Sequence, residues 1–251
     1  MKQRIHAFAI HLAISCVIAL GVAAFTFFCW YPHPYRSLSG GLELFLMIMA
    51  IDVIVGPLVT LVIYNEKKSR RAIRFDYGVI AFVQFMALGY GMWTLAQARP
   101  VHMVFEKDLF RVVHAADVDA RALGKLHPGV VPLPWNGPSW LAVRMPSDPM
   151  QRDQVLTRAL MGTYEAFQPQ LWVPYAESRE EVLAAAHPAQ ALAQQFPELS
   201  PMLEQLAKEF NVAKTAIRYL PVVGRNFVVW TVFLDAEANP MGYAAFDSLK
   251  P

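Results

Sequence analysis

Three long apolar runs dominate the first hundred residues of this chain. They cover residues 7–30, 42–64 and 77–98. Each is close to the roughly 20 residues that a helix needs to cross about 30 Å of hydrocarbon. Three such runs in so short a stretch are typical of a membrane protein rather than of buried helices in a soluble one. The pattern therefore predicts three transmembrane helices.

Basic residues near these runs predict their orientation. Lys2 and Arg4 precede the first run, whose apolar stretch is too long for a signal peptide and lacks a small-residue cleavage site, so we expect a retained anchor. Five lysines and arginines lie in the loop 65–76, but only Arg36 lies in the loop 31–41. Because basic loops stay inside, the amino terminus and the second loop are predicted to be cytoplasmic. The first loop and the chain after Arg99 then face the other side, the periplasm of a Gram-negative cell.

The hydrophobic pattern changes after residue 100 to short runs separated by turn residues. It predicts strands over 101–105, 110–114, 140–144, 216–222, 227–234 and 241–246, with a hairpin turn at 235–240 between the last two. It predicts helices over 117–126, from 148 or 153 to 164, over 178–186 with a capping box, and from 200 to 210. The prediction is therefore a membrane domain over 1–100, followed by a small periplasmic α+β domain with an antiparallel sheet over 101–251.

Composition and charge agree with this division. The chain is 55% hydrophobic and only 17% charged, with a mean hydropathy of +0.31, which excludes a disordered chain. The formal charge is +5 over residues 1–100 and −3 over 101–251, and no basic face predicts nucleic-acid binding. Cys16 and Cys29 share the first run, about 20 Å apart on a helix, so they cannot form a disulfide.

Asp52 is the sharpest candidate site residue, because it lies near the middle of the second run. A charged group there costs about 3 kcal/mol on insertion scales. We expect it to be protonated or to meet a partner at similar depth, and Gln84 and Tyr90 of the third run are the candidates. An interhelical bond that only holds the bundle together is an equally good interpretation.

Helix-distorting and small residues accompany Asp52. Gly56 and Pro57 interrupt the same run, and proline is expected to kink the helix. Thr60 is placed to satisfy carbonyls freed by the kink. Gly89 and Gly91 put small residues on the third run, which allows another helix to approach closely, either within the bundle or from a partner.

The first loop is rich in aromatic residues and proline. It contains Trp30, Tyr31, Pro32, Pro34 and Tyr35, and we expect a non-helical turn at the membrane interface.

Motifs for catalysis are absent from the sequence. There is no HExxH, CxxC, P-loop, GxSxG or GxGxxG pattern. His102, His114, His127, His187 and Ser139 show no recognisable spacing of a nucleophile and its base. We therefore expect no enzyme, no metal and no cofactor.

A set of motifs occurs in order over roughly residues 28–115. They are Trp30-Tyr31-Pro32-His33-Pro34-Tyr35 with Leu38 and Gly40-Gly41, Asp52 with Gly56-Pro57-Leu58-Val59-Thr60-Leu61, Lys67-Lys68-Ser69 with Asp76, Gln84 with Ala87-Leu88 and Tyr90-Gly91, and Ala98-Arg99-Pro100-Val101 with Phe105 and Arg111. Together these motifs resemble the type IV pilin accessory proteins of the TfpX/TfpZ group, which the segment 227–246 resembles only weakly.

The resemblance implies a non-catalytic inner-membrane chaperone that promotes pilus assembly and sets surface piliation. Its expected partners are the transmembrane helix and periplasmic head of the major pilin, the lipid bilayer and the pilus assembly machinery. Asp52, the Pro57 kink and the Gly89/Gly91 strip are then candidate contacts for the pilin helix. Two alternatives remain: a membrane-anchored periplasmic ligand-binding sensor, although the longest predicted cytoplasmic stretch is about twelve residues, and a pilin-modifying glycosyltransferase.

Overall fold

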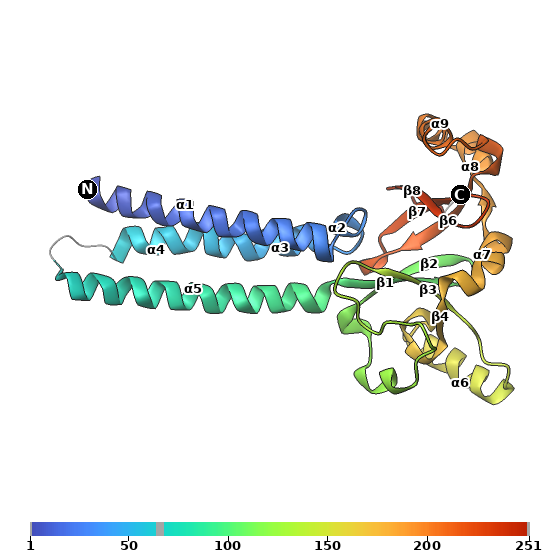
Figure 1. Cartoon of the computed structure of the whole chain (residues 1–251), viewed down its shortest axis with the longest axis horizontal. Coiled ribbons are helices and arrows are strands. Elements are labelled where there is room, and N and C mark those ends of the chain that lie inside the picture. The colour runs from blue at the N-terminus through green and yellow to red at the C-terminus, as the bar shows by residue number, and fades with distance from the viewer. Residues whose placement is uncertain (1, 64–67, 250–251) are drawn as a thin grey trace. The chain divides into compact units, whose positions relative to one another are not determined.

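The computed structural model describes residues 2–63 and 68–249, apart from the side chain of Lys125. The chain divides into two compact units, Met1–Arg99 and Pro100–Pro251, which are described here separately (Figure 1).

The first unit is helical. Its helices are α1 (Lys2–Phe25) with a π-helical turn at Thr26–Trp30, the short α2 (Tyr35–Leu38), α3 (Gly41–Ala50) with a π-helical turn at Ile51–Val55, α4 (Gly56–Ile63) and α5 (Arg70–Ala98). Three continuous helices, 2–30, 41–63 and 70–98, are long and apolar enough to cross a membrane. This confirms the three predicted runs as helices, although α5 begins seven residues before the predicted residue 77.

Two expectations about the loops change. The first loop is not wholly non-helical, because Tyr35–Leu38 forms one helical turn. In the basic second loop, Ser69 caps α5 by accepting a hydrogen bond from the Ala72 amide. The helix therefore includes three of the basic residues of that loop, Arg70, Arg71 and Arg74. The other end of that loop, residues 64–67, lies outside the described residues.

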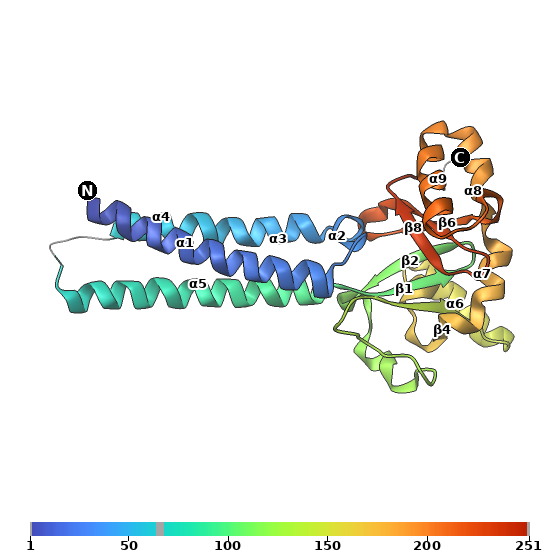
Figure 2. The ribbon, with the colours of Figure 1, turned by 45° about the horizontal axis from the view of Figure 1, so that its top comes forward.

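The three long helices of the first unit pack together as a bundle. α1 packs against α4 and the π-turn at Ile51–Val55, while α5 packs against α3 and α4 (Figures 1 and 2). At one end of the bundle a buried cluster joins all three helices through Trp30, Tyr31, Phe45, Ile48, Met49 and Leu95.

The second unit is built on one sheet of eight strands. The order is β4-β3-β1-β2-β6-β7-β8, with β5 pairing to β6. The strands are β1 (Pro100–Glu106), β2 (Leu109–His114), β3 (Ser139–Val143), β4 (Trp172–Pro174), β5 (His187–Pro188), β6 (Arg218–Val223), β7 (Val229–Leu234) and β8 (Pro240–Ala244). The predicted hairpin turn is confirmed, since the Asp235 carboxylate accepts hydrogen bonds from the Glu237 and Asn239 amides.

The expectation of a purely antiparallel sheet is wrong. β1 pairs with β3, and β2 with β6, in parallel; the other pairings are antiparallel. Alternating polarity identifies a half-buried strand but not its neighbour, and the long connections in this unit allow parallel crossovers. Every residue of β1 is buried, as expected for a central strand that is covered on both faces.

The helices of the second unit differ from prediction in several places. They are α6 (Pro149–Leu160), α7 (Arg179–Ala185), α8 (Ala189–Gln195) and α9 (Ser200–Glu209), of which α8 was not predicted. The expected helix at 117–126 is instead two 3₁₀ turns, Ala115–Asp117 and Ala120–Lys125, because His114 and Asp119 each cap a new turn. Further 3₁₀ turns are Glu165–Phe167, Pro169–Leu171, Tyr175–Ser178, Pro197–Leu199, Lys214–Ala216 and Arg225–Phe227.

A side-chain cap explains where α6 begins but not where α7 begins. Asp148 rather than Asp153 starts α6, since its carboxylate accepts the Met150 amide. The predicted capping box at Ser178 is wrong: this residue ends a 3₁₀ turn, and its side chain makes no cap hydrogen bond.

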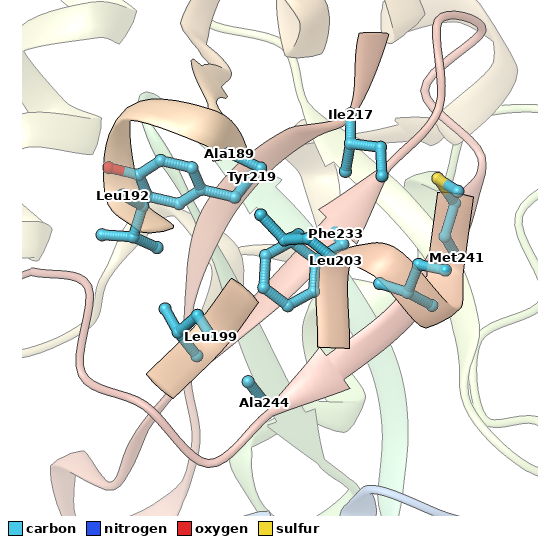
Figure 3. Close-up of a cluster of buried hydrophobic side chains, with 10 residues drawn as sticks. Ala189, Leu192, Leu199, Leu203, Ile217, Tyr219, Phe233, Met241 and Ala244 are labelled. Carbon is cyan, nitrogen blue, oxygen red and sulfur yellow. The ribbon is translucent and has the colours of Figure 1, made fainter. Parts of the chain in front are cut away.

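Apolar clusters stabilise the second unit, among them the following two. In the first, α8 and α9 cover β6, β7 and β8 through Ala189, Leu192, Leu199, Leu203, Leu206, Ile217, Tyr219, Phe233, Met241 and Ala244 (Figure 3). The second lies at β1–β4 and contains Val101, Val104, Val113, Ala115, Val130, Leu141, Ala166 and Trp172.

Candidate functional site

The π-helical turn at Ile51–Val55 leads directly into Gly56-Pro57. In an i→i+5 register the carbonyl of Asp52 would face the nitrogen of Pro57, which carries no hydrogen. Gln84 of α5 supplies the missing donor, with its Nε2 3.1 Å from the Asp52 carbonyl oxygen. The predicted distortion at Pro57 is therefore present, and a side chain from another helix satisfies the backbone.

Gly56 makes this contact possible. A Cβ on Gly56 would come within 2.5 Å of the Gln84 amide nitrogen, a distance that real Cβ atoms do not show. Glycine at this position therefore lets the Gln84 amide lie against the backbone of the second helix. Asp52, Gly56, Pro57 and Gln84 form one structural unit.

Gln84 also connects to the first helix. Its Oε1 lies 2.7 Å from His11 Nε2, and because an amide oxygen only accepts, the imidazole donates. His11 Nδ1 lies 2.6 Å from Thr60 Oγ1 of α4. The Thr60 hydroxyl thus forms a hydrogen bond with the His11 ring, in addition to any role at the kink. The ladder Thr60–His11–Gln84–Asp52 carbonyl ties all three long helices together.

The carboxylate of Asp52 takes no part in this ladder. Both of its oxygens are shielded and accept no hydrogen bond from the described residues. Gln84 was predicted as its partner but bonds its backbone carbonyl instead. The carboxyl group is therefore an unsatisfied acceptor, and leaving a buried polar group unsatisfied is unfavourable.

A groove of about 930 Å³ lies beside this carboxyl group, between α1 and α5. Residues of α1 and α5 line it together with Met49 and Asp52. Its walls are mostly apolar and include Ile10, Ile14, Ile18, Ile80, Ala81, Phe85 and Leu88; its polar lining includes Lys2, His6, His11, Ser15, Asp52 and Gln84. An apolar groove with a few convergent polar groups is the usual form of a binding site.

The small-residue strip of α5 divides into two. Gly91 is buried against Ile48 of α3, where a Cβ would come within 2.5 Å of its methyl group, so it serves the bundle. Gly89 is exposed and has nothing within 4 Å of its Cβ position. Tyr90 is 70% exposed and packs on Trp93 at 5.8 Å, so it is not the partner of Asp52.

Aromatic residues of the first loop have separate roles. Trp30 and Tyr31 are buried in the cluster at the end of the bundle, and the Tyr31 hydroxyl donates to the Leu95 carbonyl at 3.1 Å. Pro32 follows, Pro34 precedes the short helix α2, and Tyr35 begins it. None of these five residues lines the groove.

The second unit contains a histidine–serine pair that sequence reasoning missed. His102 Nδ1 lies 2.7 Å from Ser139 Oγ, and Nε2 lies 3.0 Å from the Pro132 carbonyl. The two residues are direct partners in the parallel pairing of β1 with β3, so only that register brings them together. Burial lowers the pKa of His102 to about 4. The neutral ring holds the loop that contains Pro132 against the sheet.

A buried ion pair lies at the other end of β1. Glu106 accepts from Arg111 Nε at 2.5 Å and from the Ala166 amide at 2.8 Å. The Arg111 guanidinium stacks on the Tyr164 ring at 4.1 Å. Lys107 lies 2.7 Å from the buried Glu165 carboxylate, and this hydrogen bond raises the pKa of Lys107. These contacts hold the hairpin to the segment before β4.

Metal ligands are not grouped in residues 2–63 or 68–249: no three of His, Cys, Asp and Glu come together there as a metal site would need.

Comparison with known proteins identifies the family. The family model described as "Fimbrial assembly protein FimB" matches residues 1–40. Two Dichelobacter nodosus fimbrial assembly proteins, of serogroup E1 and serogroup I, are each 35% identical over 240 residues, which is 92% of this chain and 90% of theirs. A third, of serogroups C1 and C2, is 39% identical over 109 residues, 43% of this chain and 83% of its own length.

No solved structure matches this chain significantly. The relatives of serogroups E1 and I span nearly the whole chain, including both structural units. The chain belongs to the fimbrial assembly proteins, a family of type IV pilin accessory proteins.

Proposed function

We propose that this protein is a non-catalytic inner-membrane chaperone for a type IV pilin that promotes pilus assembly and sets surface piliation. The observation that carries the proposal is the identity to fimbrial assembly proteins over 92% of the chain. In this proposal the three long helices cross the inner membrane with the amino terminus in the cytoplasm, and the second unit lies in the periplasm. The basic loop 65–76 supports that orientation.

The groove between α1 and α5 receives the transmembrane helix of the major pilin. Its apolar walls suit a helix that would otherwise contact lipid, and association within a membrane depends on close packing and interhelical hydrogen bonds. The Asp52 carboxyl group then finds a donor on the incoming helix. The exposed Gly89 is a secondary contact on the outer surface of α5.

In the same proposal, the second unit contacts the periplasmic head of the pilin and makes the protein selective for its own pilin. Holding both parts keeps an apolar subunit competent for delivery to the pilus assembly machinery.

In-cell photocrosslinking tests the groove. A photoreactive amino acid is placed at Ile14 or Phe85, on opposite walls, or at Asp52. The matched control is Val62, which is exposed on α4 and does not line the groove. Pilin adducts are expected from the groove positions and at least fivefold less from Val62; equal yields from all positions would contradict a specific groove. An adduct from Tyr243 on β8 would show contact with the second unit.

Substitution of Asp52 separates charge from hydrogen bonding. Asp52→Lys should reduce surface pili at least tenfold while the protein remains stable, because it places a cation where the pilin donor must approach. Asp52→Asn keeps an acceptor and should retain more piliation. The control Glu43→Lys reverses a charge at the exposed start of α3 and should have little effect. Normal piliation with Asp52→Lys would exclude this role for Asp52.

A further inference from the structure

A strained and exposed aromatic residue lies in the turn between β6 and β7. The Val228 amide bonds the Arg225 carbonyl at 3.1 Å, and the two central residues, Asn226 and Phe227, have φ of 54° and 59°. Such a turn favours Asn-Gly, and a bulky residue at positive φ is a backbone outlier. Phe227 is nevertheless 71% exposed, so most of its side chain is not buried against the domain.

Strand register places this turn at a particular end of the sheet. β1 begins at Pro100, whose partner on β2 is His114. β6 runs parallel to β2, with Val223 beside Arg111, so the residues after Val223 continue toward the His114 end. An electrostatic contact agrees: His114 and Arg225 together outweigh burial and lower the pKa of Asp117, which follows β2. The turn thus lies at the end of the sheet where the chain arrives from α5.

A second exposed apolar segment lies at this same end. β3 runs parallel to β1, with Ser139 beside His102, so the loop before Ser139 lies near the start of β1. The bond from His102 to the Pro132 carbonyl fixes that loop there. Val131 is 57% exposed and Trp135 is 60% exposed.

We propose that this end of the sheet, defined by Val131, Trp135, Arg225, Phe227 and Val228 and here called the apolar rim, rests on the lipid surface. Only Arg99 separates β1 from α5, the third of the helices long enough to cross a membrane. The start of β1 is therefore tethered within one residue of the end of this helix, which the proposed bilayer crossing brings to the membrane surface. Aromatic side chains with a nearby basic group are suited to the headgroup region.

Charge distribution at the rim agrees with lipid contact. Arg225 is exposed at the rim, where its charge also acts on the Asp117 carboxylate. The neighbouring Asp117 carboxylate accepts hydrogen bonds from the His114 ring and amide, each at 3.0 Å. The opposite end of the sheet differs: its β7–β8 turn, Asp235–Asn239, is polar and held by hydrogen bonds to Asp235.

The rim proposal rests on the bilayer crossing proposed above but not on the groove. Its test uses the full chain in proteoliposomes of phosphatidylcholine and phosphatidylglycerol that contain nitroxide-labelled lipids. Cys16 and Cys29 are replaced, and a single cysteine carries a polarity-sensitive fluorophore at Phe227 (Phe227→Cys). The matched control is Ala236→Cys, exposed on the turn at the opposite end of the sheet. The native Cys16, exposed on α1 and kept alone, reports whether the helices are in the bilayer.

The expected result is a blue-shifted emission at position 227 and quenching by headgroup-level nitroxides at least twofold stronger than at position 236. Quenching at Cys16 but none above the control at position 227 would overturn the rim proposal alone. Absence of quenching at Cys16 would overturn the bilayer crossing and the rim with it. A blue shift of the emission at position 227 that appears only when pilin is added would overturn lipid contact and identify a protein-docking surface.

A variant that carries no label in the β6–β7 turn keeps the proposal falsifiable if a fluorophore at position 227 perturbs that turn. Phe227→Gly relieves the positive-φ strain and should not unfold the domain, whereas it removes the aromatic anchor. Labelled at Trp135 (Trp135→Cys), this variant should show weaker lipid quenching than its Phe227 parent. Unchanged quenching would contradict cooperation of the two segments in one rim.

Discussion

The two units of this protein use polar and apolar residues in opposite ways. In the first, large apolar side chains such as Val17, Phe28 and Val62 are exposed on the outer surface, and the polar ladder of His11, Thr60 and Gln84 lies between helices. In the second, apolar residues gather in buried cores, and a buried charge is paired, as at Glu106 with Arg111. This contrast supports the bilayer crossing proposed above for the first unit.

The comparison also shows where function is available. The ladder in the first unit satisfies its amide, imidazole and hydroxyl groups but omits the Asp52 carboxyl group, which borders the groove. Buried charges of the second unit, by contrast, are engaged in holding its segments together. An incomplete polar site beside an apolar groove is a better candidate for partner binding than a complete one.

Breaking the buried ion pair is expected to have the largest effect on stability. Arg111→Ala leaves the buried Glu106 carboxylate without its cation, which typically costs about 3–5 kcal/mol. For a unit of this size, that corresponds to a fall of roughly 10 °C in the unfolding midpoint. Thermal unfolding with limited proteolysis of the full chain measures it, with the exposed Lys208→Ala as control. Equal midpoints for the two variants would show that the pair contributes little.

Acid should destabilise the second unit through His102. Its pKa is about 4 when folded and about 6.5 when unfolded, so the unfolded chain binds more protons between these values. The contribution to stability is complete above pH 6.5 and is lost as pH falls toward 4, by about 3 kcal/mol in all. Unfolding midpoints at pH 7.5 and 4.5 measure this loss. His102→Gln should flatten the dependence, whereas the exposed His187→Gln should retain it; an unchanged slope in His102→Gln would contradict the assignment.

The smallest expected effect concerns the polar ladder between the long helices. Gly56→Ala forces the Gln84 amide away from the Asp52 carbonyl and should cost about 1 kcal/mol, in the range of interhelical hydrogen bonds in membranes. In a Gln84→Ala background the clash is absent, so the same substitution should be neutral or slightly stabilising. The free energies of unfolding in detergent of the parent, the two single variants and the double variant give the coupling energy between Gly56 and Gln84. Additive changes in the free energy of unfolding would show that Gly56 is not needed to make room for the Gln84 amide.

Local signals in the sequence were sufficient for much of the fold. The three long helices follow from apolar length alone, and the hairpin at Asp235 follows from turn residues between apolar strands. Gln84 was identified as a partner of Asp52 from depth, although the actual acceptor is the backbone carbonyl. That detail depends on the π-turn before Pro57, which changes which carbonyl lacks a donor.

Nonlocal features required the structure. The parallel pairings β1–β3 and β2–β6 join segments far apart in the chain, so no short pattern indicates the neighbour of either strand. The pair His102–Ser139 depends on the first of these registers, and the common end shared by Trp135 and Phe227 depends on both. Gly89 and Gly91 illustrate the same limit, because only helix packing shows that one meets Ile48 and the other faces outward.

The sequence by itself determined that this chain has three helices long and apolar enough to span a membrane, a small mixed α and β unit after them, and the motifs of a pilin accessory family. These properties depend on composition and on the order of residues along the chain. Tertiary structure alone decided that the Asp52 carboxyl group accepts no hydrogen bond from the described residues, that a groove opens beside it, and that two exposed segments lie at the same end of the sheet. Those properties arise from contacts between distant residues, whose geometry is set by packing and strand register rather than by neighbours in sequence.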